Sequence, residues 1–162
     1  MIRKIQPSDI TDVTSIYNHY ITNTIVTFEE TPVSPEEMRN RVDKVTASDL
    51  PWLVAIDGKQ IAGYAYASLW HQRSAYRHSL EITVYLSPEH RSKGWGTRLY
   101  AELFNSLESR DVHVVIGGIA LPNPESIALH EKFGLEKVAH YREVGYKFGK
   151  WIDVGYWQKV LG

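Results

Sequence analysis

The sequence predicts a single α/β domain, residues 1–162, with helices placed between strands. Two observations carry this prediction. Apolar residues with helical spacing alternate along the chain with short apolar or β-branched runs, and Pro, Gly or a capping residue marks most junctions. In addition, no internal repeat or low-complexity linker divides a chain that is long enough to bury one sizeable core.

The chain begins with a predicted strand and helix. Residues 3–6 form the strand, and Pro7 stops it because proline has no N–H for a strand ladder. Ser8 or Asp9 caps the helix that follows, whose apolar residues keep helical spacing. Residues 21–31 are polar and β-branched and indicate a loop.

A second helix has a well-formed start signal. Ser34 is the expected N-cap, Pro35 occupies the first turn, where its missing N–H costs no helical hydrogen bond, and Glu37 completes a capping box. The inward stripe is predicted to consist of Met38, Val42 and Val45.

A hairpin is expected next. The apolar residues 52–56 indicate one strand, and Asp57 with Gly58 indicates a two-residue turn. Residues 60–69 indicate the returning strand, which is wide enough to carry a bulge near Gly63.

Residues 90–97 form a glycine turn between a strand and a helix. A loop at residues 70–78 leads to the strand at 80–86, and the helix after the turn extends to about Ser109. Such a turn leaves backbone N–H groups pointing outward, and the helix dipole adds partial positive charge at the same place. The sequence therefore predicts an anion site there, with phosphate as the expected ligand.

The C-terminal part carries a strand, a helix and two further strands. Residues 112–119 indicate a buried strand. Asn123 caps the next helix, Pro124 takes its first position, and Gly134 ends it. The alternating aromatic and polar residues at 137–160 indicate two antiparallel strands.

Composition narrows the function classes. The formal net charge of −1 gives no global attraction to nucleic acid or membranes, and the absence of cysteine excludes disulfides, thiolate metal sites and a cysteine nucleophile. No run of 18 apolar residues occurs and the N-terminus lacks an apolar signal core, so we expect a cytoplasmic protein without a membrane or nucleic-acid partner. A metal is not expected either, because Gly134 stands where a zincin motif beginning at His130 needs its second histidine.

The spacing of the glycines distinguishes between phosphate-binding motifs. Leu99 stands where a dinucleotide-binding turn needs its third glycine, and the two glycines are too close together for a P-loop. The pattern Arg91-x-x-Gly94-x-Gly96 resembles the pyrophosphate-binding loop of the GCN5-related N-acetyltransferases, which hold the diphosphate of acetyl-coenzyme A. Taken alone, so short a match also fits a basic surface turn.

Four ordered stretches resemble the phosphinothricin and methionine-sulfone acetyltransferase branch of that family. They are Thr27-Phe28-Glu29, Glu81-x-Thr83-Val84-Tyr85 with the glycine turn, Asn123-x-x-Ser126-x-x-Leu129-His130-Glu131, and Gly145-x-Lys147-x-Gly149-x-Trp151-x-Asp153-Val154. The order of elements also resembles the whole N-acetyltransferase fold. The resemblance implies a mixed, mostly antiparallel sheet with helices on both faces and splayed central strands.

The resemblance further implies that acetyl-coenzyme A is the co-substrate and that no metal takes part. The main chain of Val84, Tyr85 and Leu86 would pair with the pantetheine arm. The remaining expected cofactor contacts are Arg91, Ser92, Lys93, Gly94, Trp95, Gly96, Thr97, Asn123 and Ser126.

Glu81 is the candidate general base, acting directly or through water. An ammonium group has no lone pair, so acetyl transfer to an amine requires a proton acceptor. Hydrophobic neighbours would raise the pKa of Glu81 toward neutrality, which suits a base at physiological pH. The alternative is an edge carboxylate that pairs with Arg73 or Arg77.

His130 is a second catalytic candidate, and helical spacing places it on the same face as Asn123. Many relatives in the wider family carry Tyr at this position, and the resemblance implies that the residue here would protonate the departing thiolate. The alternative is a histidine hydrogen-bonded between helix and sheet. For the acceptor, Arg73 would pair with a carboxylate in fork geometry. Phe28 and Tyr76 would wall the pocket, with Thr83 on the same strand face as Glu81.

These expectations describe an acetyl-CoA-dependent N-acetyltransferase of a small amino-acid-like amine, of the phosphinothricin, methionine sulfoximine or methionine sulfone type. Direct transfer in a ternary complex is expected because no cysteine exists to accept the acetyl group. The alternatives are acetylation of a peptide or another amine, and a sensor that binds acyl-CoA without turnover. The aromatic C-terminal strands and the resemblance suggest a homodimer.

Overall fold

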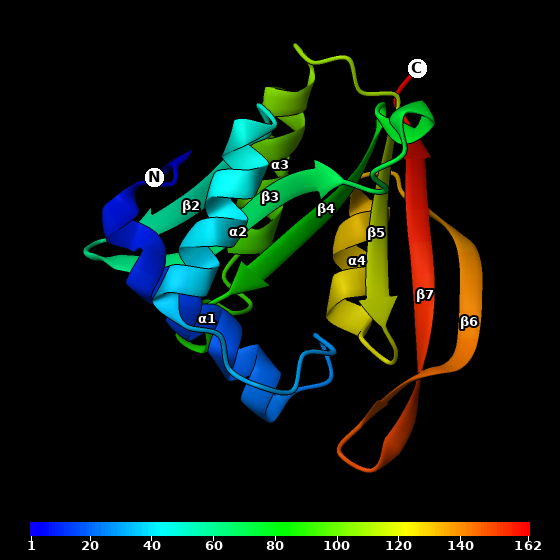
Figure 1. Cartoon of the computed structure of the whole chain (residues 1–162), viewed down its shortest axis with the longest axis horizontal. Helices are drawn as coiled ribbons and strands as arrows, with labels where there is room; N and C mark the ends of the chain where they lie inside the picture. The colour runs from blue at the N-terminus through cyan, green and yellow to red at the C-terminus, as the bar shows by residue number, and fades with distance from the viewer. The chain divides into compact units, whose positions relative to one another are not determined.

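The computed structural model describes all residues, 1–162, as one α/β fold (Figure 1). The strands are β1 (Ile2–Lys4), β2 (Trp52–Asp57), β3 (Gln60–Leu69), β4 (Ser79–Leu86), β5 (Val114–Ala120), β6 (Glu136–Lys147) and β7 (Lys150–Val160). The helices are α1 (Ile10–Asn23), α2 (Pro35–Ala47), α3 (Trp95–Leu107) and α4 (Pro124–Lys132), with short 3-10 turns at Pro7–Asp9, Ser74–Tyr76 and Pro88–His90.

The strands form a seven-stranded sheet in the order β1-β2-β3-β4-β5-β7-β6. The pairs β1–β2, β2–β3, β5–β7 and β6–β7 are antiparallel, whereas β4 and β5 are parallel. The predicted mixed and mostly antiparallel sheet is therefore confirmed. The β4–β5 pairing comprises three residue pairs and ends at Glu81 and Ile116, as expected for central strands that diverge.

The residues cluster in two compact units. The first unit comprises Met1–Asn18, Val33–Ser68 and Ile82–Asp111, and the second comprises His19–Pro32, Leu69–Glu81 and Val112–Gly162. Each unit has its own buried residues.

In the first unit, α2 and α3 cover opposite faces of the sheet around β2 (Figure 1). The predicted stripe of α2 is buried at Met38, Val42 and Val45. The four-residue spacing in α3 likewise produces a buried stripe, and Leu99 and Leu103 have no exposed surface. Burial of these apolar faces is the main favourable contribution to the folding of this unit.

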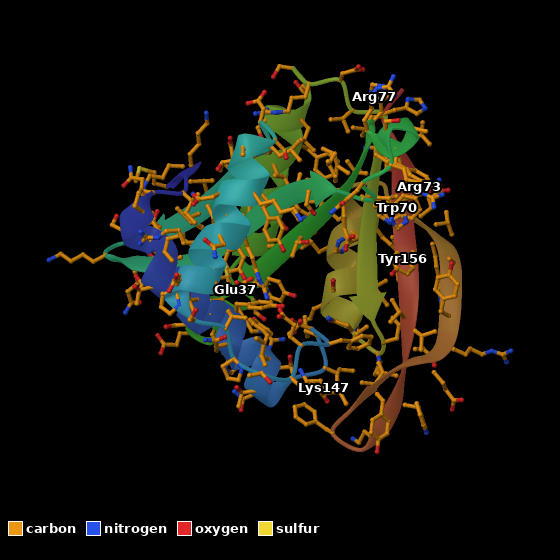
Figure 2. All side chains as sticks on the ribbon, viewed as in Figure 1. Glu37, Trp70, Arg73, Arg77, Lys147 and Tyr156 are labelled. Carbon is orange, nitrogen blue, oxygen red and sulfur yellow. The ribbon has the colours of Figure 1, made fainter.

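The start of α2 corrects one prediction. Ser34 Oγ accepts a hydrogen bond from the Glu37 N–H at 3.0 Å, so the predicted N-cap is confirmed. The carboxylate of Glu37, labelled in Figure 2, does not close the capping box but accepts from Arg41 Nε at 3.1 Å. An i, i+4 ion pair on the helix surface therefore replaces the predicted backbone contact.

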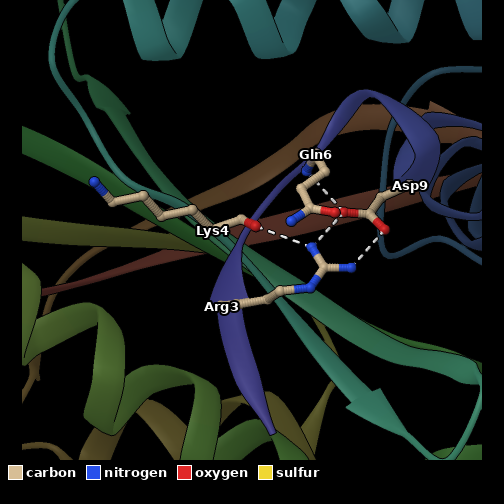
Figure 3. Close-up of polar contacts among 4 residues, drawn as sticks. All are labelled: Arg3, Lys4, Gln6 and Asp9. Atoms are coloured by element: carbon tan, nitrogen blue, oxygen red, sulfur yellow. Dashed lines mark hydrogen bonds and ion pairs between the residues drawn. The ribbon is translucent and has the colours of Figure 1, made fainter.

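The N-terminal cap also differs from its prediction (Figure 3). Neither Ser8 nor Asp9 caps α1; Gln6 instead caps the 3-10 turn that precedes it. Asp9 is buried, and its carboxylate accepts two hydrogen bonds from Arg3, at 2.7 and 3.0 Å, and one from the Gln6 N–H at 2.7 Å. Burial alone would raise the pKa of Asp9, but these bonds outweigh it and hold the pKa below its usual value.

Two loop boundaries shift for local reasons. α1 continues to Asn23, beyond the predicted loop start, because Ile21 is buried and its packing outweighs a low helix propensity. The hairpin turn lies at Gly58 and Lys59 rather than Asp57 and Gly58, and Gly58 has the positive φ of +61° that this turn requires.

In the second unit, β7 pairs along the whole of β5 and β6 pairs along β7 (Figure 1). Leu135 and Trp157 are buried in this unit. The helix α4 packs on β5 at Gly117, where the His130 ring lies against the strand backbone. The predicted pair of C-terminal antiparallel strands is therefore confirmed.

Candidate active site

The glycine turn has the geometry of an anion site in the first unit. Gly94 is the N-cap of α3 with φ +85°, and no side chain caps this helix. A Cβ atom added at Gly94 would meet nothing within 4 Å, so the turn faces open space. The first N–H groups of a helix have no carbonyl partner within it, and the helix dipole adds positive charge.

Neighbouring side chains anchor and charge this turn. Trp95 is buried, and the Arg98 guanidinium stacks over its ring at 4.2 Å. Arg91 and Lys93 are exposed beside the turn. Ser92 has a positive φ of +62°, a conformation that reverses the chain just before the helix.

The end of β4 lies close to the bulged part of β3. Gly63 pairs with Ala55 and Ile61 with Ile56, so Ala62 is the extra residue of the bulge that the sequence predicted. A Cβ at Gly63 would be 2.7 Å from the carbonyl oxygen of Tyr85, and only glycine permits this approach. The Ala62 carbonyl in turn accepts from the Ser87 N–H at 2.8 Å.

Tyr85 is held by other aromatic rings. Its ring meets the edge of Tyr17 at 5.3 Å and tilts against Tyr64 at 5.6 Å. Val84, Tyr85 and Leu86 are all half-buried, as is Thr83. These contacts fix the direction of the β4 main chain, where the pantetheine contacts were predicted.

Glu81 lies in the second unit, on the part of β4 that pairs with β5. Burial raises the pKa of Glu81, in the predicted direction, and the electrostatic interaction with His71 opposes part of this rise. The alternative of an ion pair with an arginine finds no support. Arg77 donates to the carbonyl of Ser74 at 3.0 Å, and Arg73 is exposed.

His71 belongs to an aromatic cluster that sequence reasoning did not identify. Its ring lies 4.0 Å from the Trp70 ring and 5.2 Å from the Tyr76 ring, and Trp70 and Tyr76 meet edge to face at 5.5 Å. Figure 2 labels Trp70 and Arg73, which come from the β3–β4 connection. The adjacent aromatic residues in that loop were the available signal, but nothing in the sequence linked His71 to Glu81.

Tyr156, labelled on β7 in Figure 2, is a second residue that was missed. Burial raises the pKa of the Tyr156 hydroxyl, and the negative charge of Glu81 adds to the rise. The ring lies on β5, where a Cβ at Gly118 would be 3.0 Å from Tyr156 Cε1. A glycine within a strand signals such a close approach, although not which ring makes it.

His130 is buried between α4 and β5. Its Nδ1 lies 2.7 Å from the carbonyl oxygen of Ser126, and since a carbonyl only accepts, the ring proton is on Nδ1. A Cβ at Gly117 would be 2.6 Å from Nε2, so the ring occupies the space that a side chain there would need. Burial lowers the pKa of His130, and the bond to Ser126 opposes this only in part.

Asn123 and Ser126 lie at the start of the same helix. Asn123 Oδ1 accepts from the Ser126 N–H at 3.2 Å, which confirms the predicted N-cap. The Ser126 hydroxyl lies 3.4 Å from His130 Nδ1. Hydrogen bonds therefore link the two predicted coenzyme A contacts at the start of α4 to the histidine in its last turn.

Phe28 lies in another part of the second unit. Its ring is partly exposed and lies directly on the backbone of Gly145 in β6.

No group of three or more His, Asp or Glu side chains is arranged to hold a metal ion. No helix combines the length and the apolar character that crossing a membrane requires.

Comparison with known proteins assigns the family. The family model described as Acetyltransferase (GNAT) domain matches residues 2–155. The chain therefore belongs to the GNAT acetyltransferase family, and the N-acetyltransferase fold implied by the sequence is confirmed.

Two curated relatives indicate the branch. The chain is 37% identical to a phosphinothricin N-acetyltransferase of Streptomyces coelicolor, over 94% of this chain and 91% of the relative. It is 32% identical to an L-methionine sulfoximine/L-methionine sulfone acetyltransferase of Salmonella typhimurium, over 99% of this chain and 94% of the relative.

Two solved structures share the fold. A GNAT superfamily phosphinothricin acetyltransferase from Sinorhizobium meliloti, in complex with AcCoA, superposes with a TM-score of 0.97 at 37% identity, covering 100% of this chain and 88% of that one. A ribosomal-protein-alanine N-acetyltransferase from Brucella melitensis superposes with a TM-score of 0.96 at 36% identity, covering 99% of each chain.

Proposed function

We propose that the chain transfers the acetyl group of acetyl-CoA to the primary amine of a small amino-acid-like acceptor, of the phosphinothricin, methionine sulfoximine or methionine sulfone type. The observation that carries this proposal is the half-buried Glu81, whose pKa burial raises. Such a carboxylate is a suitable acceptor for an ammonium proton near neutral pH. The two curated relatives named above support this choice of acceptor.

Acetyl-CoA is proposed to bind through its diphosphate at the glycine turn. The open Gly94 corner, the start of α3 and the exposed Arg91 and Lys93 support this role. Ser92, Trp95, Gly96 and Thr97 complete the turn, and Asn123 with Ser126 would contact coenzyme A. The main chain of residues 84–86 would hold the pantetheine arm.

In the proposed reaction, Glu81 accepts a proton from the substrate ammonium, directly or through water. The neutral amine then attacks the thioester carbonyl carbon, and a C–N bond forms as the C–S bond breaks. The electron pair of that bond leaves on sulfur, and the thiolate takes up the second proton, which the nitrogen loses as the amide forms. Direct transfer is favoured because the sequence has no cysteine to carry the acetyl group.

The role of His130 is proposed to be orientation rather than acid catalysis. Donation of a proton to the thiolate would require a charged ring, and burial disfavours that form. With its proton held toward the Ser126 carbonyl, the neutral ring fixes the start of α4 against β5. Asn123 and Ser126 would be positioned by the same contacts.

In the proposed acceptor site, Arg73 binds the carboxylate of the acceptor. Tyr76, Phe28 and Thr83 surround the rest of the acceptor molecule. Arg73 is exposed beside the cluster of Trp70, His71 and Tyr76, and His71 interacts electrostatically with Glu81. An arginine there would direct the α-amine of a carboxylate-bearing substrate toward the base.

A homodimer is also part of the proposal. The hairpin of β6 and β7 exposes a group of large apolar side chains, and surfaces of this kind mark protein interfaces. They are Val138, Tyr141, Val144, Tyr146, Phe148 and Trp151. The proposed form is a single 162-residue domain that pairs with a second copy through this hairpin. The proposed location is the cytoplasm, where acetyl-CoA is used. Sedimentation should give twice the monomer mass.

Thiol release from acetyl-CoA tests the proposal against a panel of amino acids and analogues. We expect turnover with methionine sulfone or phosphinothricin, and a loss of about 10²-fold in kcat for Glu81→Gln with coenzyme A binding retained. Turnover only with a peptide bearing an N-terminal alanine would instead favour the activity named for the Brucella protein. If no amine is acetylated, the remaining alternative is a sensor that binds acyl-CoA without turnover.

A further inference from the structure

Lys147 is a buried cation for which the proposed reaction has no use. It lies at the end of β6 and is 2% exposed. Its Nζ donates to the carbonyl oxygen of Thr27 at 2.8 Å, across 120 residues of sequence. Figure 2 shows Lys147 near the turn that joins β6 and β7.

The segment that receives this hydrogen bond carries Phe28. The Phe28 ring lies directly on the backbone of Gly145, two residues before Lys147, and any side chain at 145 would overlap the ring. The strand β6 therefore contacts residues 27–28 at two points. The Lys147 ammonium donates to the Thr27 carbonyl, and the Gly145 backbone lies under the Phe28 ring. The Lys147 ammonium also lies 5.2 Å from the centre of the Phe148 ring.

A buried ammonium group is costly unless it is compensated. Burial lowers the pKa of Lys147, and the carboxylates of Glu30 and Glu29 oppose this shift. An apolar side chain of similar length would fill the same space without the desolvation cost. What only the lysine supplies is a donor aimed at the main chain immediately before Phe28.

We propose that Lys147 is a positioning residue for acceptor selection. By holding the Thr27 carbonyl, it keeps Phe28 seated on Gly145 in the orientation that contacts the acceptor side chain. This inference rests on the proposed function, in which Phe28 is a wall of the acceptor pocket. It assigns the Gly145-x-Lys147 part of the C-terminal strands a role in substrate specificity rather than in the chemical step.

The first experiment compares Lys147→Met with Lys150→Met. Lys150 is exposed and is the register partner of Lys147 in the same hairpin, so it is a matched control. We expect Lys147→Met to raise KM for methionine sulfone about tenfold, while KM for acetyl-CoA and kcat change less than about twofold. Lys150→Met should leave all three constants unchanged. Equal effects of the two variants, or a parallel rise in KM for acetyl-CoA, would overturn the proposal.

The second experiment tests whether Lys147 acts through Phe28. Phe28→Ala and the double variant Phe28→Ala/Lys147→Met should show nearly the same KM for methionine sulfone, because the lysine has nothing left to position. Gly145→Ala, which displaces Phe28 and keeps the lysine, should raise the same constant. Additive effects in the double variant would mean that Lys147 acts independently of the ring.

Amide hydrogen exchange supplies a readout that does not require turnover. In Lys147→Met the amides of residues 26–30 should exchange about tenfold faster than in the wild type, whereas those of β5 should not change. Unchanged exchange at residues 26–30 would refute the positioning role. If the wild-type protein acetylates no acceptor but this local difference is present, the proposed function fails while the lysine contact stands.

Discussion

The ring of His130 occupies the space above Gly117, so that a Cβ on this glycine would be 2.6 Å from both Nε2 and Cδ2. The contact joins the helix that begins at Asn123 to the strand that pairs with Glu81. Because the ring is buried and bonded to Ser126, it has little freedom to move aside. A change at Gly117 should therefore affect both stability and the site.

Gly117→Ala is predicted to destabilise the protein by about 1 to 3 kcal/mol, the usual cost of overpacking a well-packed interior. Urea denaturation measures this. Gly118→Ala is the matched comparison, because its Cβ would be 3.0 Å from the Tyr156 ring, a less severe approach. A Gly117→Ala protein as stable as the wild type would show that α4 is not held by this contact.

Replacement of His71 by phenylalanine is predicted to shift the acid limb of the profile of kcat/KM against pH. Burial raises the pKa of Glu81, and the electrostatic interaction with His71 opposes that rise, so removal of the imidazole lets the pKa of Glu81 rise further. The acid limb should then move to higher pH, because a higher pH is needed to ionise the base. If the acid limb does not move, either His71 does not influence the pKa of Glu81 or the ionisation of Glu81 does not produce the acid limb.

Arg73→Ala is predicted to weaken acceptor binding selectively. We expect KM for carboxylate-bearing amines to rise about 10- to 100-fold, since a charge-assisted pair is lost, with a much smaller rise for the corresponding amides. Initial rates with methionine sulfone and its amide provide the comparison. Equal losses for both substrates would indicate that Arg73 contributes packing rather than carboxylate recognition.

Asp9→Asn is predicted to destabilise the protein by about 1.5 to 3 kcal/mol at pH 7, the range for hydrogen bonds to charged groups. The folded pKa of Asp9 lies below its unfolded value, so its contribution to stability is present above pH ~4 and is lost as the pH falls through the folded pKa. Urea denaturation at pH 7 and pH 3 measures both. A difference between variant and wild type that does not shrink at pH 3 would contradict this linkage.

The starts of the helices were predictable because their signals are local. Ser34 with Glu37 and Asn123 with Ser126 are three residues apart, and each pair forms the predicted cap. The predicted cap was wrong at the start of α1, where more than one side chain could have made the capping hydrogen bond. Asp9 is taken by Arg3 from β1 instead of capping a helix.

Local residue patterns were enough to predict the order of elements, the glycine turn that begins α3 and the position of Glu81 on a strand, since each depends on residues within a few positions. The folded chain was needed to show which groups act on Glu81, which glycine accommodates His130 and which carbonyl receives the Lys147 ammonium. This division arises because pKa values and close packing depend on groups that are distant in sequence. Folding brings those groups together, and no local pattern of residues records them.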